Sequence, residues 1–196
     1  FLATGHRPVS APFGQQADHD LEAGVLWVSD KATRGGPSTR LVALAPFAKD
    51  QLGFWMEHLE ALAGRLDRLG SRVHQTRIRP IFSPSRGGAP LPLFFFLAED
   101  GRVVEVTETE IRDRRAGVLP KPVNAARHML RTHLAASRMP THAIDAFFGH
   151  GRLGEEPLVF DSALRFGDLQ NIAMAAQNLL EDLGFTPLRS PLCPPR

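Results

Sequence analysis

Hydrophobic residues are spaced along the chain in two ways, which predicts both strands and helices. The apolar runs 24–29 and 40–45 are each strand-sized and are separated by turn-forming residues, so they predict a β-hairpin. The runs 91–98 and 103–106 flank a turn at Gly101 and predict a second hairpin. No apolar run reaches the length that a membrane-spanning helix requires.

Helical spacing of apolar residues accounts for much of the remaining chain. The predicted helices cover 47–69, 124–137, 141–148 and 164–183. The apolar stripe of the second helix consists of Ala126, Met129, Leu130 and Leu134. Asn124 and Thr141 are expected to cap the second and third helices with their side chains. The predicted fold class is therefore α+β, mainly α, with a small antiparallel sheet packed on helices. We expect one domain over 1–186 and a Pro-rich tail over 187–196.

Charge is the feature of the composition that bears on function. The net charge of the 196-residue chain is only +2, but nearly all basic residues are arginines. Guanidinium groups bind phosphate through two parallel hydrogen bonds, which suits a nucleic-acid partner, although the codon bias of a GC-rich genome also produces arginine. Segments 65–86 and 112–138 are basic, while 99–110 is acidic. This placement is typical of a surface that binds a polyanion, with an ordinary solvated face as the alternative. The single cysteine, Cys193, excludes an internal disulfide and favours the reducing cytoplasm.

The most informative segment runs from Asn124 to Gly151. His128 and Arg131 lie three residues apart on a predicted helix, so their side chains are expected to point the same way. A short helix then ends at Gly149-His150, and Phe160 follows ten residues after His150. The His-x-x-Arg pair alone is common by chance, whereas the order and spacing of all these parts is more specific.

This order resembles the second half of the catalytic domain of the tyrosine recombinase (phage integrase) family. There, His-x-x-Arg on a helix is followed by a short helix ending in Gly-His and by a tyrosine nine or ten residues later. The family's other parts are an arginine after a Thr-Gly turn and a lysine in the following hairpin, which correspond here to Arg7 and Lys31. The resemblance covers nearly the whole chain and implies an integrase-like fold. The stretch 72–90 is longer than the usual pattern and looks like an insertion.

The resemblance implies cleavage and rejoining of DNA without a metal or a nucleotide cofactor. Arg7 and Arg131 would bind the non-bridging oxygens of the phosphate, and His150 would donate a further hydrogen bond. Lys31 would protonate the leaving 5′ oxygen, and His128 would manage the proton of the nucleophile. In family members that nucleophile is a tyrosine, which forms a covalent 3′-phosphotyrosine link to DNA.

Phe160 stands where this tyrosine is expected, and the chain contains no tyrosine at all. Because Phe160 has no hydroxyl, this chain is expected to bind a phosphate but not to form the covalent intermediate. Two explanations stay open: a tyrosine replaced to trap a DNA complex, which we favour, or a naturally inactive relative. Phe166 is the rival position, but it lies sixteen residues beyond His150, which is too far for the usual spacing.

The resemblance also implies a biological setting, namely a prophage or mobile element whose integrase recombines double-stranded DNA as a homotetramer in the bacterial cytoplasm, at the nucleoid. Family members carry a separate N-terminal DNA-binding domain, which is expected to be missing here. The segment 164–196 is expected to dock on a neighbouring subunit. The alternatives are a non-catalytic DNA-binding or regulatory module on the same fold, and a helical interaction protein that contains these residues by chance.

Other residues and motifs are expected to lie outside the site. Arg34 and Arg40 are expected to touch the DNA backbone or nothing, and Arg127 and His133 to point elsewhere. The sequence lacks His-Glu-x-x-His, paired cysteines, Gly-x-Ser-x-Gly and a Gly-rich phosphate loop. A zinc site, a serine hydrolase and an ATP-dependent enzyme are therefore not predicted.

Overall fold

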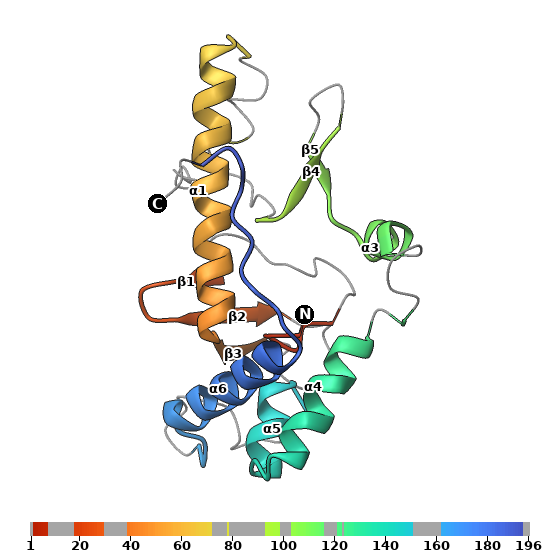
Figure 1. Ribbon diagram of the computed structural model, residues 1–196. Helices are drawn as coiled ribbons and strands as arrows, with labels where there is room; N and C mark the ends of the chain where they lie inside the picture. Colours follow the sequence, from red (N-terminus) through yellow and green to blue (C-terminus); the bar gives the residue numbers. More distant parts are fainter. Residues whose placement is uncertain are drawn as a thin grey trace.

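The computed structural model shows helices combined with small antiparallel sheets, as the α+β prediction requires (Figure 1). It describes residues 2–7, 18–29, 39–71, 78, 93–98, 103–115, 121–122, 124–150 and 162–193. The strands are β1 (His19–Asp20), β2 (Val25–Ser29), β3 (Thr39–Ala43), β4 (Phe95–Leu97) and β5 (Val103–Glu105). The helices are α1 (Pro46–Arg68), α3 (Glu108–Arg115), α4 (Ala125–Ala136), α5 (Thr141–Phe147) and α6 (Phe166–Asp182).

The larger sheet has the antiparallel order β1-β2-β3, and the pairing of β2 with β3 places Leu26 opposite Val42. Both side chains belong to the main hydrophobic core. Leu41 faces the other way and packs with Leu169 of α6, so β3 is buried on both faces. Burial on both faces explains why 40–45 is an almost continuous apolar run rather than an alternating one.

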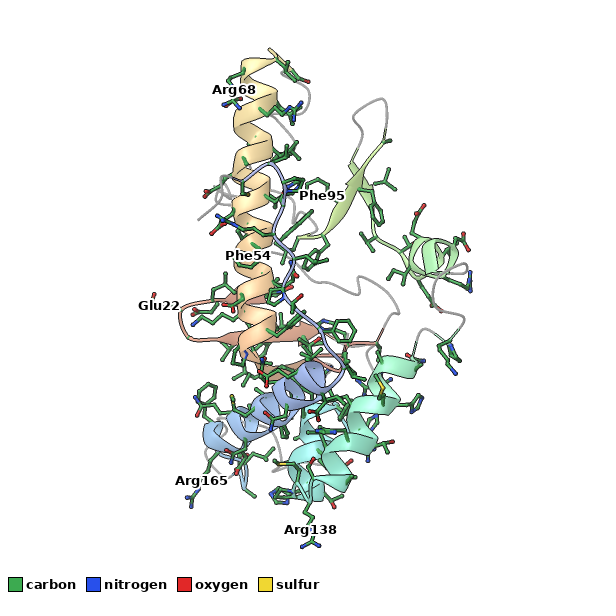
Figure 2. All side chains as sticks on the ribbon, in the orientation of Figure 1. Glu22, Phe54, Arg68, Phe95, Arg138 and Arg165 are labelled. Carbon is green, nitrogen blue, oxygen red and sulfur yellow. The ribbon has the colours of Figure 1, made fainter. Side chains whose placement is uncertain are left out.

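Helices α4, α5 and α6 pack together beside this sheet, at the lower end of the molecule in Figure 1. Their buried side chains, among them Leu130, Phe147 and Ile172, complete the main core. Helix α1 begins at the sheet and extends away from it. Leu59 and Phe95 form a separate small core with Ile78 between the outer part of α1 and the hairpin β4-β5. Figure 2 shows labelled side chains of both elements in this region.

Most predicted elements are confirmed within a few residues, but the capping predictions are only partly confirmed. Asn124 is the N-cap residue of α4, as predicted, but its side chain makes no capping hydrogen bond, because the residue has helical backbone angles. The N-cap of α5 is Pro140 rather than Thr141. The sequence pattern also missed α3, whose single apolar residue, Ile111, cannot form a periodic stripe. The two-residue strand β1 was missed because so short a segment shows no alternation.

Among the described residues, no helix combines the length and apolar character that crossing a membrane requires.

Candidate anion-binding site

The turn after α5 positions His150. Gly149 has a φ of +67°. The Gly149 N–H donates to the carbonyl oxygen of Ala146 at 3.0 Å, and the His150 N–H donates to that of Asp145 at 2.7 Å. These two bonds form a Schellman motif, which ends the helix and turns the chain sharply. The Gly-His pair of the sequence is therefore a helix stop that presents an imidazole beside α4.

Within the described part of the chain, three guanidinium groups from two different segments surround this imidazole. Arg7 Nη2 lies 3.0 Å from Nε2 of His150, and Arg127 Nη2 lies 3.3 Å from the same nitrogen. Arg131 Nη1 lies 3.3 Å from Nδ1 on the other side of the ring. We call Arg7, Arg127, Arg131 and His150 the His150 cluster. The structure thus brings together three residues predicted for the site and adds Arg127.

The His150 cluster has more hydrogen-bond donors than acceptors. A neutral imidazole has one N–H and one acceptor nitrogen, but both ring nitrogens of His150 face guanidinium N–H groups. At least one ring nitrogen must therefore point its own N–H at another donor. Arg7 has no carboxylate partner within the described part of the chain. An anion brought from outside would supply the missing acceptors.

Asp145 provides one carboxylate at the edge of the cluster. Its Oδ1 accepts a hydrogen bond from Arg131 Nη2 at 2.6 Å, and the two side chains are 28% and 38% exposed respectively. Burial lowers the pKa of His150, and the positive charges of Arg127, Arg131 and Arg7 lower it further against the opposing effect of Asp145. The imidazole is therefore neutral at pH 7 and lies in a positive electrostatic field.

The prediction that Arg127 points away from the site is wrong. Its side chain is only 7% exposed, and its guanidinium donates to the carbonyl oxygens of Gly5 and Phe148. The guanidinium carbon also lies 4.7 Å from the centre of the Phe148 ring. Spacing contained a signal for this position, because Arg127 lies three and seven residues before Leu130 and Leu134, the two fully buried leucines of α4.

The prediction that Arg40 touches DNA or nothing is also wrong. Arg40 is 6% exposed and donates to the carbonyl oxygens of Phe147 and, at 3.2 Å, of Gly5. The last carbonyls of a helix have no partner within the helix. Arg40 and Arg127 supply such partners at the end of α5, which satisfies both the carbonyls and the two buried charges.

Gly5 is required by the geometry of this region. Its φ is +59°, and a Cβ atom at this position would lie 2.8 Å from Cε1 of Phe148. Next to it, Thr4 Oγ1 and His6 Nδ1 are 2.9 Å apart. Burial lowers the pKa of His6 well below its usual range. The Thr-Gly turn thus packs tightly against α5 and directs the following residue, Arg7, to His150.

The remaining predicted site residues are placed differently or are not described. The side chain of His128 is exposed and forms no hydrogen bond or ion pair with the described residues, so it is not part of the cluster. His133 lines a pocket between α4 and α6 and, as predicted, points elsewhere. Lys31, Arg34 and Phe160 lie outside the described residues.

No group of three or more His, Cys, Asp or Glu side chains in the described ranges is arranged to hold a metal ion. Comparison of the chain with protein-family models, with curated proteins and with solved structures gave no match. The chemistry of the His150 cluster and the sequence motif are therefore the features of this chain that point to a function.

Proposed function

We propose that this chain is the catalytic domain of a tyrosine recombinase and that the His150 cluster binds a phosphate of double-stranded DNA. The observation that carries the proposal is the convergence of Arg7, Arg127 and Arg131 on one imidazole, with donors in excess of acceptors. A phosphodiester oxygen is an acceptor with no hydrogen of its own, so it complements this cluster.

The arrangement suits strand cleavage because charge on the phosphate grows in the transition state. Arg7 and Arg131 are the groups available to bind the non-bridging oxygens, and His150 lies between them. The integrase-like fold, the tetramer on DNA, the mobile-element origin and the nucleoid location remain part of this proposal, as do the roles of Lys31 and His128.

One observation favours a second function. The chain contains no tyrosine, and Phe160 stands where the resemblance places the nucleophile. A non-catalytic DNA-binding or regulatory protein on the same fold would retain the phosphate contacts without the covalent chemistry. The two proposals share the His150 cluster and differ only in whether the cluster serves a cleavage step.

A tyrosine hydroxyl at position 160 would distinguish the recombinase from the non-catalytic protein. We expect Phe160→Tyr to form a covalent protein–DNA adduct on nicked duplexes of randomised sequence, visible as a shifted band on a denaturing gel. The matched control adds Arg131→Met to Phe160→Tyr, which keeps the phenol and removes one phosphate contact. The unchanged chain is the second control, and neither control is expected to give the adduct.

The outcomes are distinct. DNA binding without any adduct from Phe160→Tyr would favour the non-catalytic protein. An adduct that forms equally well with Arg131→Met would separate the chemistry from the His150 cluster. Absence of DNA binding by the unchanged chain, or an affinity that does not fall as salt rises, would contradict both functions.

A further inference from the structure

Arg127 occupies a position that the proposed phosphate contacts do not explain. It is buried in α4 and donates to two backbone carbonyls, those of Gly5 and Phe148. Gly5 lies two residues before Arg7, and Phe148 lies two residues before His150. One guanidinium therefore joins the backbone segment that carries Arg7 to the turn that carries His150.

The same guanidinium also reaches the imidazole. Arg127 Nη2 lies 3.3 Å from Nε2 of His150, and Arg7 Nη2 lies 3.0 Å from that nitrogen. Two donors directed at Nε2 favour the tautomer in which Nε2 is the acceptor and Nδ1 carries the proton. Among the described residues, Arg131 supplies the one guanidinium that faces Nδ1. The Nδ1–H is thereby directed to the side of the ring where Arg131 lies.

We propose that Arg127 is a positioning residue of the anion site, which holds Arg7 and His150 in register and keeps Nε2 of His150 as an acceptor. The proposal rests on the proposed function for the identity of the anion. The tautomer and the positioning can be measured without any ligand, so the two can fail separately. With Nε2 engaged, the N–H of His150 points at the space beside Arg131, where a bound anion oxygen would accept it.

Arg40 provides a matched comparison within the same packing. It is as deeply buried as Arg127, it donates to the same oxygen of Gly5, and it also binds a carbonyl at the end of α5. The charges that act on the pKa of His150 are those of Arg127, Arg131, Arg7 and Asp145, whereas Arg40 acts on that of His6. Loss of Arg40 should therefore disturb packing and leave the imidazole of His150 unchanged.

The experiment is a ¹⁵N NMR titration of the histidine side chains, with His150→Asn used to assign the His150 signals. In the unchanged chain we expect a neutral His150 ring with the proton on Nδ1. Arg127→Gln should raise the pKa of His150 toward its ordinary value and increase the population of the Nε2–H tautomer. Arg127→Lys keeps the positive charge, so the pKa of His150 should stay lowered. The population of the Nε2–H tautomer should nevertheless increase, because the lysine lacks the guanidinium geometry. Arg40→Gln should lower the melting temperature without changing the pKa or the tautomer of His150.

Several results would overturn the proposal. A neutral ring protonated on Nε2 in the unchanged chain would do so without any variant, even if Arg127→Gln failed to fold. Equal shifts from Arg127→Gln and Arg40→Gln would make the role of Arg127 merely structural. If the tautomer responds as expected but neither the unchanged chain nor Arg127→Lys binds duplex DNA, the positioning role stands and the proposed function fails.

Discussion

The C-terminal tail on α1 and the His150 cluster are both built on arginine, yet their hydrogen bonding differs. Residues 185–193 run along α1 (Figure 1). The side-chain amide of Gln51 donates to the carbonyl of Leu188 at 3.0 Å and accepts from its N–H at 2.8 Å. Arg189 donates twice to one carboxylate oxygen of Glu57, at 3.2 and 3.0 Å. In these contacts each donor meets an acceptor.

At the His150 cluster, donors outnumber acceptors. Both nitrogens of His150 face guanidinium groups, and of the two arginines Arg7 and Arg131 only the latter has a carboxylate partner among the described residues. The tail contact pairs its donors with acceptors from the chain itself. Under the proposed function, an acceptor from a bound anion would complete the hydrogen bonding of the cluster. The two regions thus differ in their balance of donors and acceptors, and this balance makes the His150 cluster the candidate binding site.

The largest effect is expected from Gly5→Ala. The new Cβ would meet Phe148 at 2.8 Å and the residue would keep a φ of +59°, so we expect the free energy of unfolding to fall by roughly 2 to 4 kcal/mol. Urea denaturation measures it. Gly53→Ala is the control, because nothing lies within 4 Å of a Cβ atom there and helical alanine should be neutral or stabilising. A free energy of unfolding for Gly5→Ala that is no lower than that of Gly53→Ala would show that the region around Gly5 tolerates the added Cβ atom.

The next effect concerns DNA binding and tests the comparison directly. Arg131→Met should weaken binding to duplex DNA by about tenfold or more and reduce the slope of affinity against salt by about one phosphate contact. Arg189→Met is the matched control, since it also removes an arginine that is paired with a carboxylate, but one that lies outside the His150 cluster. Fluorescence anisotropy over a salt series measures both. An equal loss with Arg189→Met would erase the distinction between the two regions.

A smaller effect is expected on stability at the tail. The side chains of Arg189 and Glu57 are 25% and 34% exposed, so solvent screens the pair. Arg189→Met should therefore lower the free energy of unfolding by only about 0.2 to 1 kcal/mol, measured by urea denaturation. Glu57→Gln should cost a similar amount. A loss of several kcal/mol would mean that the tail contact holds the whole fold.

The smallest effect is expected in the pH dependence of stability. Burial lowers the pKa of His58, whose Nδ1 lies 2.7 Å from Ser190 Oγ, and it likewise lowers those of His150 and, more strongly, His6. A histidine whose folded pKa is below the unfolded value binds more protons when unfolded. The contribution of these histidines to the free energy of unfolding is therefore fully present above the unfolded pKa. It is lost as the pH drops through 6.5 toward the folded pKa.

Urea midpoints measured between about pH 7.5 and pH 5 test this sign. His58→Gln should remove the part of this pH dependence that comes from His58 and leave DNA binding unchanged. Saturating duplex DNA should instead remove the part of the pH dependence that comes from His150, because a bound anion raises the pKa of the imidazole. A free energy of unfolding that rises as the pH falls would contradict the lowered pKa values of these histidines.

Sequence periodicity predicted the elements well because the helices α1, α4 and α6 each bury one face. It failed where local chemistry depends on neighbours that are distant in the chain. Asn124 is a good capping residue by type, but its helical backbone leaves the side chain unable to cap. The buried face of α4 is also displaced from the predicted stripe, since Met129 is 42% exposed and Arg127 is buried instead.

The candidate site was predicted in part. Motif spacing indicated Arg7, Arg131 and His150 because helix geometry and the Gly149 turn are local properties of the sequence. Arg127 was missed because a buried arginine is assigned only when its acceptors are known, and both acceptors are backbone carbonyls from other segments. A carbonyl is present at every residue, so no side-chain pattern marks the ones that matter.

Arg40 and Arg127 both donate to the carbonyl oxygen of Gly5. That oxygen belongs to the peptide bond between Gly5 and His6, so the orientation of one peptide plane satisfies two buried cations at once. Losses at positions 40 and 127 will therefore not add, since the second substitution removes a bond whose acceptor has already been released. During sequence divergence these two positions and Gly5 should behave as a single inherited unit, in which a change at one alters the cost of change at the others.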